Sequence, residues 1–411
     1  MRKVLGITLG IMTALGGFVD LGQIVFTMQA GAVFGYNLLW AIVLGTAAII
    51  VYMEMCGRVA VVSQEPVFAV VRTRLGFPFG LVTLIASNLL NMITCAAELG
   101  GIAIILHLLT GWPEKLLLLA STFLLVILIL LLKFQWIERS FGLAGLLMVV
   151  FAVSAVVLHP NWNELAHGLL PKPGGSDAKQ GLRYAYFAVG IFSALLMEYE
   201  VHFYSSGAIE EDWTAKDLGE NFLVAAFGSV LGALITMALL VLGVLVFLPR
   251  GIFPDALSTT ALAGAFPFRQ KGLLLALLGM LATLCGAAIE TGLSGAYNVC
   301  QFFNRAWGKN QPPRSVPIYT AMWIGMFVLA LITAFIAGRP LQLVNISIIF
   351  GMVVMPFTYY PILRVAADKN VMGKHVNSRL DTIVGSVFLF LITLAAIAAI
   401  PLMILSHSGT P

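Results

Sequence analysis

The chain has 411 residues, of which 60% are hydrophobic and only 10% are charged. Soluble domains carry about 25% charged residues, so this composition excludes a soluble globular protein and predicts an all-α polytopic membrane protein. The formal net charge of +4 does not require nucleic acid or another acidic partner, because membrane proteins carry positive loops on their cytoplasmic side. The four cysteines lie within apolar stretches without metal-binding spacing, which favours small core residues over disulfides.

Eleven hydrophobic segments follow one another along the chain, and each holds the roughly 20 apolar residues that a helix needs to cross a bilayer. Their approximate bounds are 5–30, 36–61, 79–110, 114–133, 140–158, 182–207, 218–249, 271–303, 315–337, 341–364 and 380–405. The connections are mostly short, and the longest, 159–180, separates segment five from segment six. We therefore expect one transmembrane transporter domain over residues 1–411.

The distribution of lysine and arginine predicts the orientation. If the N-terminus is cytoplasmic, 15 of the 23 basic residues fall in inside loops and the remaining 8 fall outside. Cytoplasmic loops carry the excess of positive charge in membrane proteins. With an odd number of crossings, we expect a cytoplasmic N-terminus and a C-terminus outside, in the cell membrane.

The first segment contains a polar break. Asp20 lies past its middle and is followed by Gly22 and Gln23. An ionised aspartate within a membrane helix costs about 2.5–3.5 kcal/mol on insertion scales unless a partner compensates it. Glycine lets the backbone leave helical geometry and expose carbonyl oxygens. This combination predicts a cation site, in which the Gln23 amide is either a further ligand or an ordinary interhelical hydrogen bond.

The sixth segment repeats this feature, because Glu198, Glu200 and His202 lie about two-thirds of the way along it. Segments one and six are five crossings apart, so they run in opposite directions. Two interrupted helices that face each other near the bilayer midplane are typical of a five-plus-five inverted repeat. The expected divisions are repeat one at about 5–158, repeat two at about 182–364 and an extra helix at about 380–405.

Several residues of the sixth segment have competing interpretations. Met197 offers a thioether to softer ions such as Mn²⁺, Fe²⁺ or Cd²⁺, although methionines in apolar helices usually serve packing. Glu198 and Glu200 would diverge by about 200° on a regular helix, so both can face one cavity only where the backbone is unwound. His202 could carry protons near neutral pH or be a hydrogen-bonded core histidine.

Six other acidic residues have fewer competing interpretations. Glu98 in the third segment and Glu290 in the eighth are isolated intramembrane acids, which are candidates for proton relays or for structural hydrogen bonds. Glu54 lies four residues before Arg58, and this spacing predicts a local salt bridge. The acids at 210–212 follow segment six, where we expect a solvated surface.

Residues 20–23 read Asp-Leu-Gly-Gln, and residues 29–40 read Gln-Ala-Gly-Ala-Val-Phe-Gly-Tyr-Asn-Leu-Leu-Trp. These stretches resemble the NRAMP family of divalent-metal transporters, which has Asp-Pro-Gly-Asn followed by an Ala-Gly, Phe-Gly-Tyr and Leu-Leu-Trp stretch. Further matches lie at 97–100, 291–292, 355–357 and 368–377. The resemblance implies a LeuT-like fold with eleven helices, interrupted helices one and six, and proton-linked uptake of divalent metal.

The departures from the family pattern concentrate at the site. Leu21 replaces the motif proline and Gln23 replaces its asparagine, which keeps an amide but lengthens the side chain. Residues 197–199 read Met-Glu-Tyr where family members carry Met-Pro-His, and Ala194 keeps the spacing of a backbone-carbonyl ligand.

Two further departures affect helices three and ten. Cys95 replaces an acid in helix three. In helix ten the family's ligating glutamine falls at Ile348, with Asn345 one turn earlier.

These observations favour a secondary transporter of divalent cations such as Mn²⁺, Fe²⁺ or Mg²⁺. The expected ligands are Asp20, Gln23, the Ala194 carbonyl, Met197, Glu198 and Glu200. Candidates for a proton relay or a second site are Glu98, His202, Glu290 and Asn345.

The acid-rich sixth segment leaves a second hypothesis open, a transporter of the same fold for an organic cation or an amine-bearing solute. A membrane receptor is a weaker alternative, because no signalling domain is appended. An enzyme is disfavoured, because no Ser-His pair, HExxH motif or nucleotide-binding glycine loop occurs. We expect no cofactor, nucleic acid or obligate protein partner; the metal is cargo, and protons are the possible coupling ion.

Overall fold

The computed structural model describes residues 19–172, 174 and 177–409. Within this part of the chain the regular elements are all helical. The α-helices are α2 (Leu21–Phe34), α3 (Leu39–Ser63), α4 (Val67–Leu75), α5 (Phe77–Thr110), α6 (Glu114–Leu131), α7 (Phe134–Gly145), α8 (Val149–Val157), α9 (Trp162–Gly168), α10 (Ala178–Leu195), α11 (Glu198–Glu210), α12 (Leu218–Leu242), α13 (Leu257–Phe302), α14 (Pro317–Ala337), α15 (Pro340–Ala366), α16 (Lys369–Met372) and α17 (Arg379–Leu405). The predicted segment 5–30 is represented by α2, and its part before residue 19 lies outside the described residues.

Nine helical stretches of the described chain are long and apolar enough to cross a membrane. The first two predicted segments form one stretch, Leu21–Ser63, because only the short 3-10 turn Gly35–Leu38 separates α2 from α3. The sixth predicted segment is divided between α10 and α11, and neither half alone is long and apolar enough to cross a membrane. The chain is a multi-pass membrane protein, as its composition predicts.

Proline and glycine mark the ends of several helices. Pro317 opens α14, where a missing N–H costs nothing, and Gly338 ends it with a positive φ of 63° and a backbone bond to the Ala334 carbonyl. Gly111 ends α5 in the same way, with φ at 75°. These residues fix the short connections that the sequence predicts between neighbouring segments.

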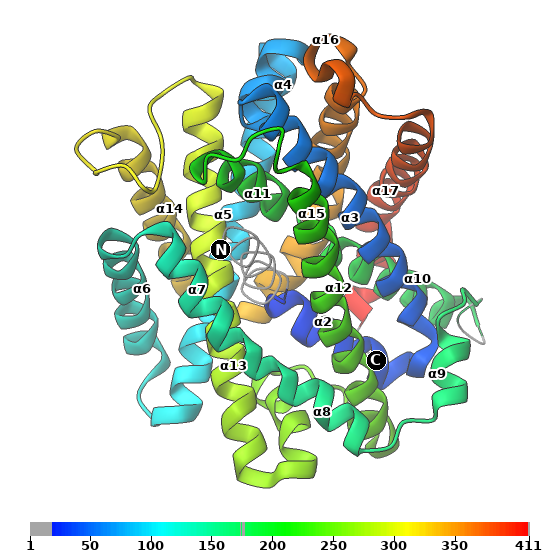
Figure 1. Ribbon diagram of the computed structural model, residues 1–411. Coiled ribbons are helices and arrows are strands. Elements are labelled where there is room, and N and C mark those ends of the chain that lie inside the picture. Colours follow the sequence, from blue (N-terminus) through cyan, green and yellow to red (C-terminus); the bar gives the residue numbers. More distant parts are fainter. Residues whose placement is uncertain (1–18, 173, 175–176, 410–411) are drawn as a thin grey trace.

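The helices form an inner group and an outer group (Figure 1). The outer helices α6, α14 and α17 expose large apolar side chains, including Leu131, Ile336 and Ile397. The inner helices α2, α11 and α13 are mostly buried. Since lipid is as apolar as these side chains, the exposed faces of the outer helices need no further cover inside a bilayer.

Two glycines allow α2 to lie against the end of α12. A Cβ added at Gly31 would lie 2.1 Å from the Leu240 carbonyl oxygen, and one added at Gly243 would lie 2.3 Å from the Met28 carbonyl oxygen. Gly243 also opens the π-helical turn Gly243–Phe247 that continues α12. Small residues at helix crossings let two backbones touch within a membrane, and this contact fixes the position of the helix that begins after Asp20.

The predicted salt bridge between Glu54 and Arg58 is confirmed, with Arg58 Nε 2.8 Å from Glu54 Oε1. Arg58 also donates to the His375 carbonyl at 2.8 Å and to Asn377 Oδ1 at 2.7 Å. The pair therefore ties α3 to the connection between α16 and α17, a contact that local spacing does not reveal.

The prediction of a solvated surface at 210–212 is wrong for Glu210. Its half-buried carboxylate accepts from the Tyr297 hydroxyl at 2.9 Å and from the backbone N–H groups of Lys309 and Asn310. Lys309 Nζ donates to the Leu132 carbonyl at 2.7 Å. Burial lowers the pKa of Lys309, and the charge of Glu210 opposes this shift. Glu210 therefore fastens the connection between α13 and α14 to the end of α11.

The contact between α2 and α12 predicts the outcome of one substitution. Gly31→Val would overlap the Leu240 carbonyl, whereas Gly325→Val on α14 meets open space. Overpacking typically costs about 1–3 kcal/mol. Thermal unfolding in detergent is expected to show a lower Tm for Gly31→Val than for Gly325→Val. Equal Tm values for the two variants would contradict the close crossing.

Candidate functional site

Two carboxylates meet the N-terminus of α2 inside the protein. Asp20 is the N-cap, and its Oδ1 accepts from the Gln23 backbone N–H at 2.8 Å. Glu98 reaches across from α5, and its Oε1 accepts from the Leu21 backbone N–H at 3.1 Å. Both side chains are buried, at 3% and 1% exposure. The unpaired N–H groups and the positive end of the helix dipole stabilise negative charge at this point.

The sixth predicted segment is interrupted, as its acids indicate. α10 ends at Leu195 and α11 begins at Glu198. Between them Leu196 has φ −108° and ψ 31°, and Met197 has φ −55° and ψ 119°, so the backbone leaves the helix. Glu198 and Glu200 both stand in the first turn of α11, where the helix dipole favours acids.

Side chains from other helices satisfy the carbonyls that the break exposes. Gln23 Nε2 donates to the Ala194 carbonyl at 2.8 Å. The Tyr359 hydroxyl donates to the Leu196 carbonyl at 2.7 Å. Ser193 Oγ in turn donates to the Ile348 carbonyl at 2.6 Å. The break is therefore held by α2 and α15 and does not need a proline or glycine of its own.

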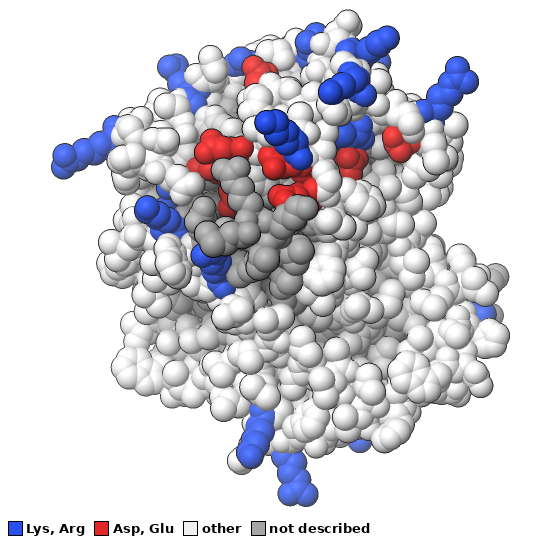
Figure 2. Space-filling view, in the orientation of Figure 1, with Lys and Arg blue, Asp and Glu red and all other residues white. Residues whose placement is uncertain are grey.

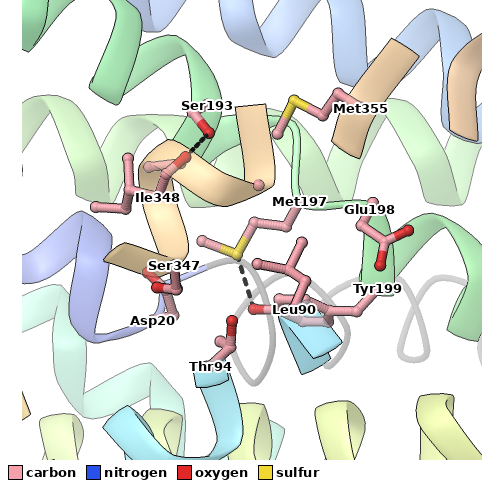
Figure 3. A pocket seen from close by; sticks show the side chains of 12 residues that line it. Asp20, Leu90, Thr94, Ser193, Met197, Glu198, Tyr199, Ser347, Ile348 and Met355 are labelled. Atoms are coloured by element: carbon pink, nitrogen blue, oxygen red, sulfur yellow. Dashed lines mark hydrogen bonds between the residues drawn. The ribbon is translucent and has the colours of Figure 1, made fainter. Parts of the chain in front are cut away.

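A small cavity of about 20 Å³ lies where these elements meet (Figure 3). That volume holds about one water molecule or one ion without its hydration shell. The lining residues are Asp20, Leu90, Thr94, Ser193, Ala194, Met197, Glu198, Tyr199, Ser347, Ile348, Gly351 and Met355. Of the residues expected from the sequence, the lining contains Asp20, Ala194, Met197 and Glu198.

The other expected residues lie outside this lining. Gln23 borders it through its bond to Ala194. Glu98 lies behind Asp20 on the same helix end. Asn345 is half-buried, and Ser347 lines the cavity in its place. Two positions correspond to about 200° around a helix, so the two side chains point to different sides of α15.

Met197 has a partner within its own turn. The Tyr199 hydroxyl donates to Met197 Sδ at 2.8 Å, and Figure 3 shows this bond at the centre of the cavity lining. Ser294 Oγ of α13 donates to the Tyr199 carbonyl at 3.4 Å, which helps to hold the residue in place. The sequence does not reveal this bond, because it depends on the unwound geometry at 196–197.

Glu198 lies in a separate polar cluster with side chains of α5 and α15. Its Oε2 accepts from Ser87 Oγ at 2.6 Å and from Thr358 Oγ1 at 3.0 Å. His202 Nδ1 is 3.3 Å from the same oxygen, one turn further along α11. Figure 3 shows Met197 between the Glu198 carboxylate and Asp20 in that view. His202 therefore faces Glu198 rather than the cavity.

Glu200 and Glu290 are two further buried acids. Both carboxylate oxygens of Glu200, and Oε2 of Glu290, lack a partner among the described residues. Among the described residues, no three His, Cys, Asp or Glu side chains gather as a metal cluster. An ion held here would need ligands other than acids alone.

Together the interrupted helix, the buried N-terminus of α2 and the central cavity define a multi-pass membrane protein of the LeuT-like fold. The sequence matches the profile described as "Natural resistance-associated macrophage protein-like" over residues 10–401, and the chain belongs to this family, Nramp. The match covers nearly the whole chain and confirms the resemblance that the motifs indicate.

Curated relatives and solved structures agree with this assignment. The chain is 26% identical over 392 residues to the divalent metal cation transporter MntH of Latilactobacillus sakei, covering 90% of this chain and 82% of that protein. It is 25% identical over 388 residues to MntH of Staphylococcus aureus, covering 90% and 84%.

Two solved structures share the fold. The Eremococcus coleocola manganese transporter matches with a TM-score of 0.75 at 22% identity, covering 98% of this chain and 88% of that one. MhsT in complex with L-phenylalanine matches with a TM-score of 0.62 at 14% identity, covering 97% and 98%. These likenesses confirm the predicted LeuT-like arrangement.

The hydrogen bond at Leu196 generates a prediction. Tyr359→Phe would leave this buried carbonyl without its partner, at a cost of about 1–3 kcal/mol. Tyr186→Phe is the matched control, because its buried hydroxyl has no partner among the described residues. Thermal unfolding in detergent is expected to show a clear loss of Tm for Tyr359→Phe and little change for Tyr186→Phe. Similar shifts in both would mean that the bond does not stabilise the break.

Proposed function

We propose that this protein is a secondary transporter that moves divalent metal cations across the cell membrane by alternating access, with Asp20 at its centre. The observation that carries the proposal is a buried carboxylate that lines a cavity of about 20 Å³ beside an interrupted helix. Interrupted helices near the midplane are where secondary transporters bind their substrates. Membership of the Nramp family and the relatives named divalent metal cation transporters support the same substrate class.

The proposed ligand atoms are carboxylate, amide and carbonyl oxygens, which come from Asp20, Gln23, the Ala194 carbonyl, Glu198 and Glu200. The Met197 thioether lies beside them and could bind only an ion that reaches it past its hydrogen-bond donor, Tyr199. The bond between Gln23 Nε2 and the Ala194 carbonyl would open on binding, so that both oxygens face the ion. Gln23 Oε1 is buried and has no hydrogen-bond partner among the described residues, which supports this step. Glu198 and Glu200 add charge, with Glu198 the nearer to the cavity.

Proton coupling is part of the proposal. Glu98 shares the N-terminus of α2 with Asp20, and its Oε2 has no hydrogen-bond partner among the described residues. A proton on Glu98 would weaken the electrostatic competition between the two carboxylates. His202, Glu290 and Asn345 are further candidates for a relay or a second site.

We place the N-terminus in the cytoplasm and the C-terminus outside, on the basis of the positive-inside rule. Figure 2 shows most of the visible Lys and Arg at the end that carries α4 and α16, with a broad uncharged zone beyond it. That end would be cytoplasmic. The whole chain would work as one transport domain whose two repeats rock against each other, without a resident cofactor.

The alternative substrate, an organic cation or an amine-bearing solute, has weaker support. A cavity of about 20 Å³ accommodates an ion but not a molecule of several heavy atoms. Carboxylate, amide and carbonyl oxygens around one point are the ligands of Mn²⁺ and Mg²⁺. The cavity therefore favours the metal.

Uptake into proteoliposomes tests the proposed function. Wild-type protein is expected to admit radiolabelled Mn²⁺, and Asp20→Ala is expected to reduce entry to the level of protein-free liposomes, because the central charge is lost. Asp255→Ala removes an exposed acid in the loop before α13 and serves as the control. Absence of uptake of any divalent cation by the wild type would overturn the proposal.

The proton step makes a separate prediction. Glu98→Gln keeps a carbonyl oxygen for the Leu21 N–H but cannot carry a proton. An inward proton gradient is expected to accelerate Mn²⁺ uptake by the wild type and by the exposed-acid control Glu114→Gln, and to leave Glu98→Gln unaffected. Equal acceleration in all three proteins would exclude Glu98 as the proton carrier.

A further inference from the structure

The Met197 thioether, which lines the cavity, already accepts a hydrogen bond. Met197 Sδ accepts from the Tyr199 hydroxyl at 2.8 Å, and both side chains are buried, at 8% and 2% exposure. The two residues line the same cavity from the interrupted stretch and the first turn of α11 (Figure 3). A thioether is a weak acceptor, and the phenol hydroxyl already lies against the sulfur. A soft ion must displace this hydroxyl, or approach beside it, to reach the sulfur.

Buried oxygen atoms in the cavity lining and directly behind it, in contrast, lack hydrogen-bond partners within the described part of the chain. Gln23 Oε1, Glu98 Oε2 and Glu198 Oε1 have no hydrogen-bond partner among the described residues. The exposures of these side chains are 1%, 1% and 0%. Such buried acceptors are costly unless a ligand or a proton satisfies them. The atoms most ready to receive a cation are therefore amide and carboxylate oxygens.

We propose that Tyr199 withholds the Met197 thioether from the transported ion and thereby makes the site selective for oxygen-preferring cations, Mn²⁺ and Mg²⁺, over the soft ion Cd²⁺. The proposal rests on the proposed function and assigns its substrate class. Sulfur ligands favour soft metals, whereas carboxylate and carbonyl oxygens suit magnesium and manganese. Tyr199 acts through Met197, so it is a positioning residue, and its effect lies in the ratio between ions rather than in the overall rate.

Competition against Mn²⁺ uptake in proteoliposomes measures that ratio. Tyr199→Phe keeps the aromatic ring but removes the hydroxyl that occupies the sulfur. The Cd²⁺ concentration that halves Mn²⁺ uptake is therefore expected to fall about tenfold relative to the Mg²⁺ concentration that does so. A tenfold change corresponds to the free energy of about one buried hydrogen bond. Tyr186→Phe again removes a buried hydroxyl without a partner among the described residues, and its Cd²⁺ to Mg²⁺ ratio is expected to equal that of the wild type.

A double-mutant cycle assigns the change to sulfur. Met197→Ala is expected to weaken Cd²⁺ competition about tenfold more in the Tyr199→Phe background than in the wild-type background. Equal effects of Met197→Ala in the two backgrounds, or an unchanged ratio in Tyr199→Phe, would overturn the inference.

Cadmium X-ray absorption on purified protein provides a readout that does not depend on transport. The four cysteines are present in every variant and contribute equally to each spectrum. We expect a sulfur neighbour of Cd²⁺ that appears in Tyr199→Phe and disappears in the double variant. A Met197-dependent sulfur neighbour already present in the wild type would contradict the proposal. If the wild type transported no divalent cation, the proposed function would fall, while these spectra would still decide whether Tyr199 controls access to the sulfur.

Discussion

The structure depends on how a helix can begin in the middle of a membrane. The first N–H groups of α2 have no partner within the helix, and no water is present in a bilayer core to satisfy them. Asp20 and Glu98 accept from the N–H groups of Gln23 and Leu21. The dipole of α2 favours negative charge at this end, so two buried acidic side chains and an unsatisfied helix end compensate one another. The site exists because this arrangement holds acidic side chains at a defined place.

The break between α10 and α11 is stabilised by a side chain from the start of α2. Gln23, in the first turn of α2, supplies the hydrogen bond that satisfies the Ala194 carbonyl, while Tyr359 of α15 satisfies the Leu196 carbonyl. The chain thus keeps a broken helix without a proline at residues 196–198. The acids at 198 and 200 occupy the first turn of α11, where a helix dipole tolerates them. Their separation places Glu198 among hydroxyl groups and leaves both carboxylate oxygens of Glu200 without a partner among the described residues.

Much of the fold could be read from the sequence, because hydrophobic length and a few polar interruptions determine how a chain crosses a membrane. Asp20 and the break before Glu198 were predictable for that reason. The contacts of Glu198 were not, since Ser87 and Thr358 lie on helices that meet α11 only after folding. Asn345 and Ser347 differ by two positions, and only the rotation of α15 determines which of them reaches the cavity. The features that could not be predicted are therefore mainly side-chain contacts between helices.

The close crossing of α2 and α12 has a consequence for movement. A helix can slide or roll over a neighbour when side chains separate the two backbones, but at Gly31 and Gly243 the main chains themselves are nearly in contact. Rotation of α2 about its axis would drive Cα and carbonyl groups into each other, so α2 and the end of α12 must travel as a single body. A hinge that opens the cavity would then lie at the start of α2, beside Asp20, and the carboxylate that receives the ion would also stand at the pivot.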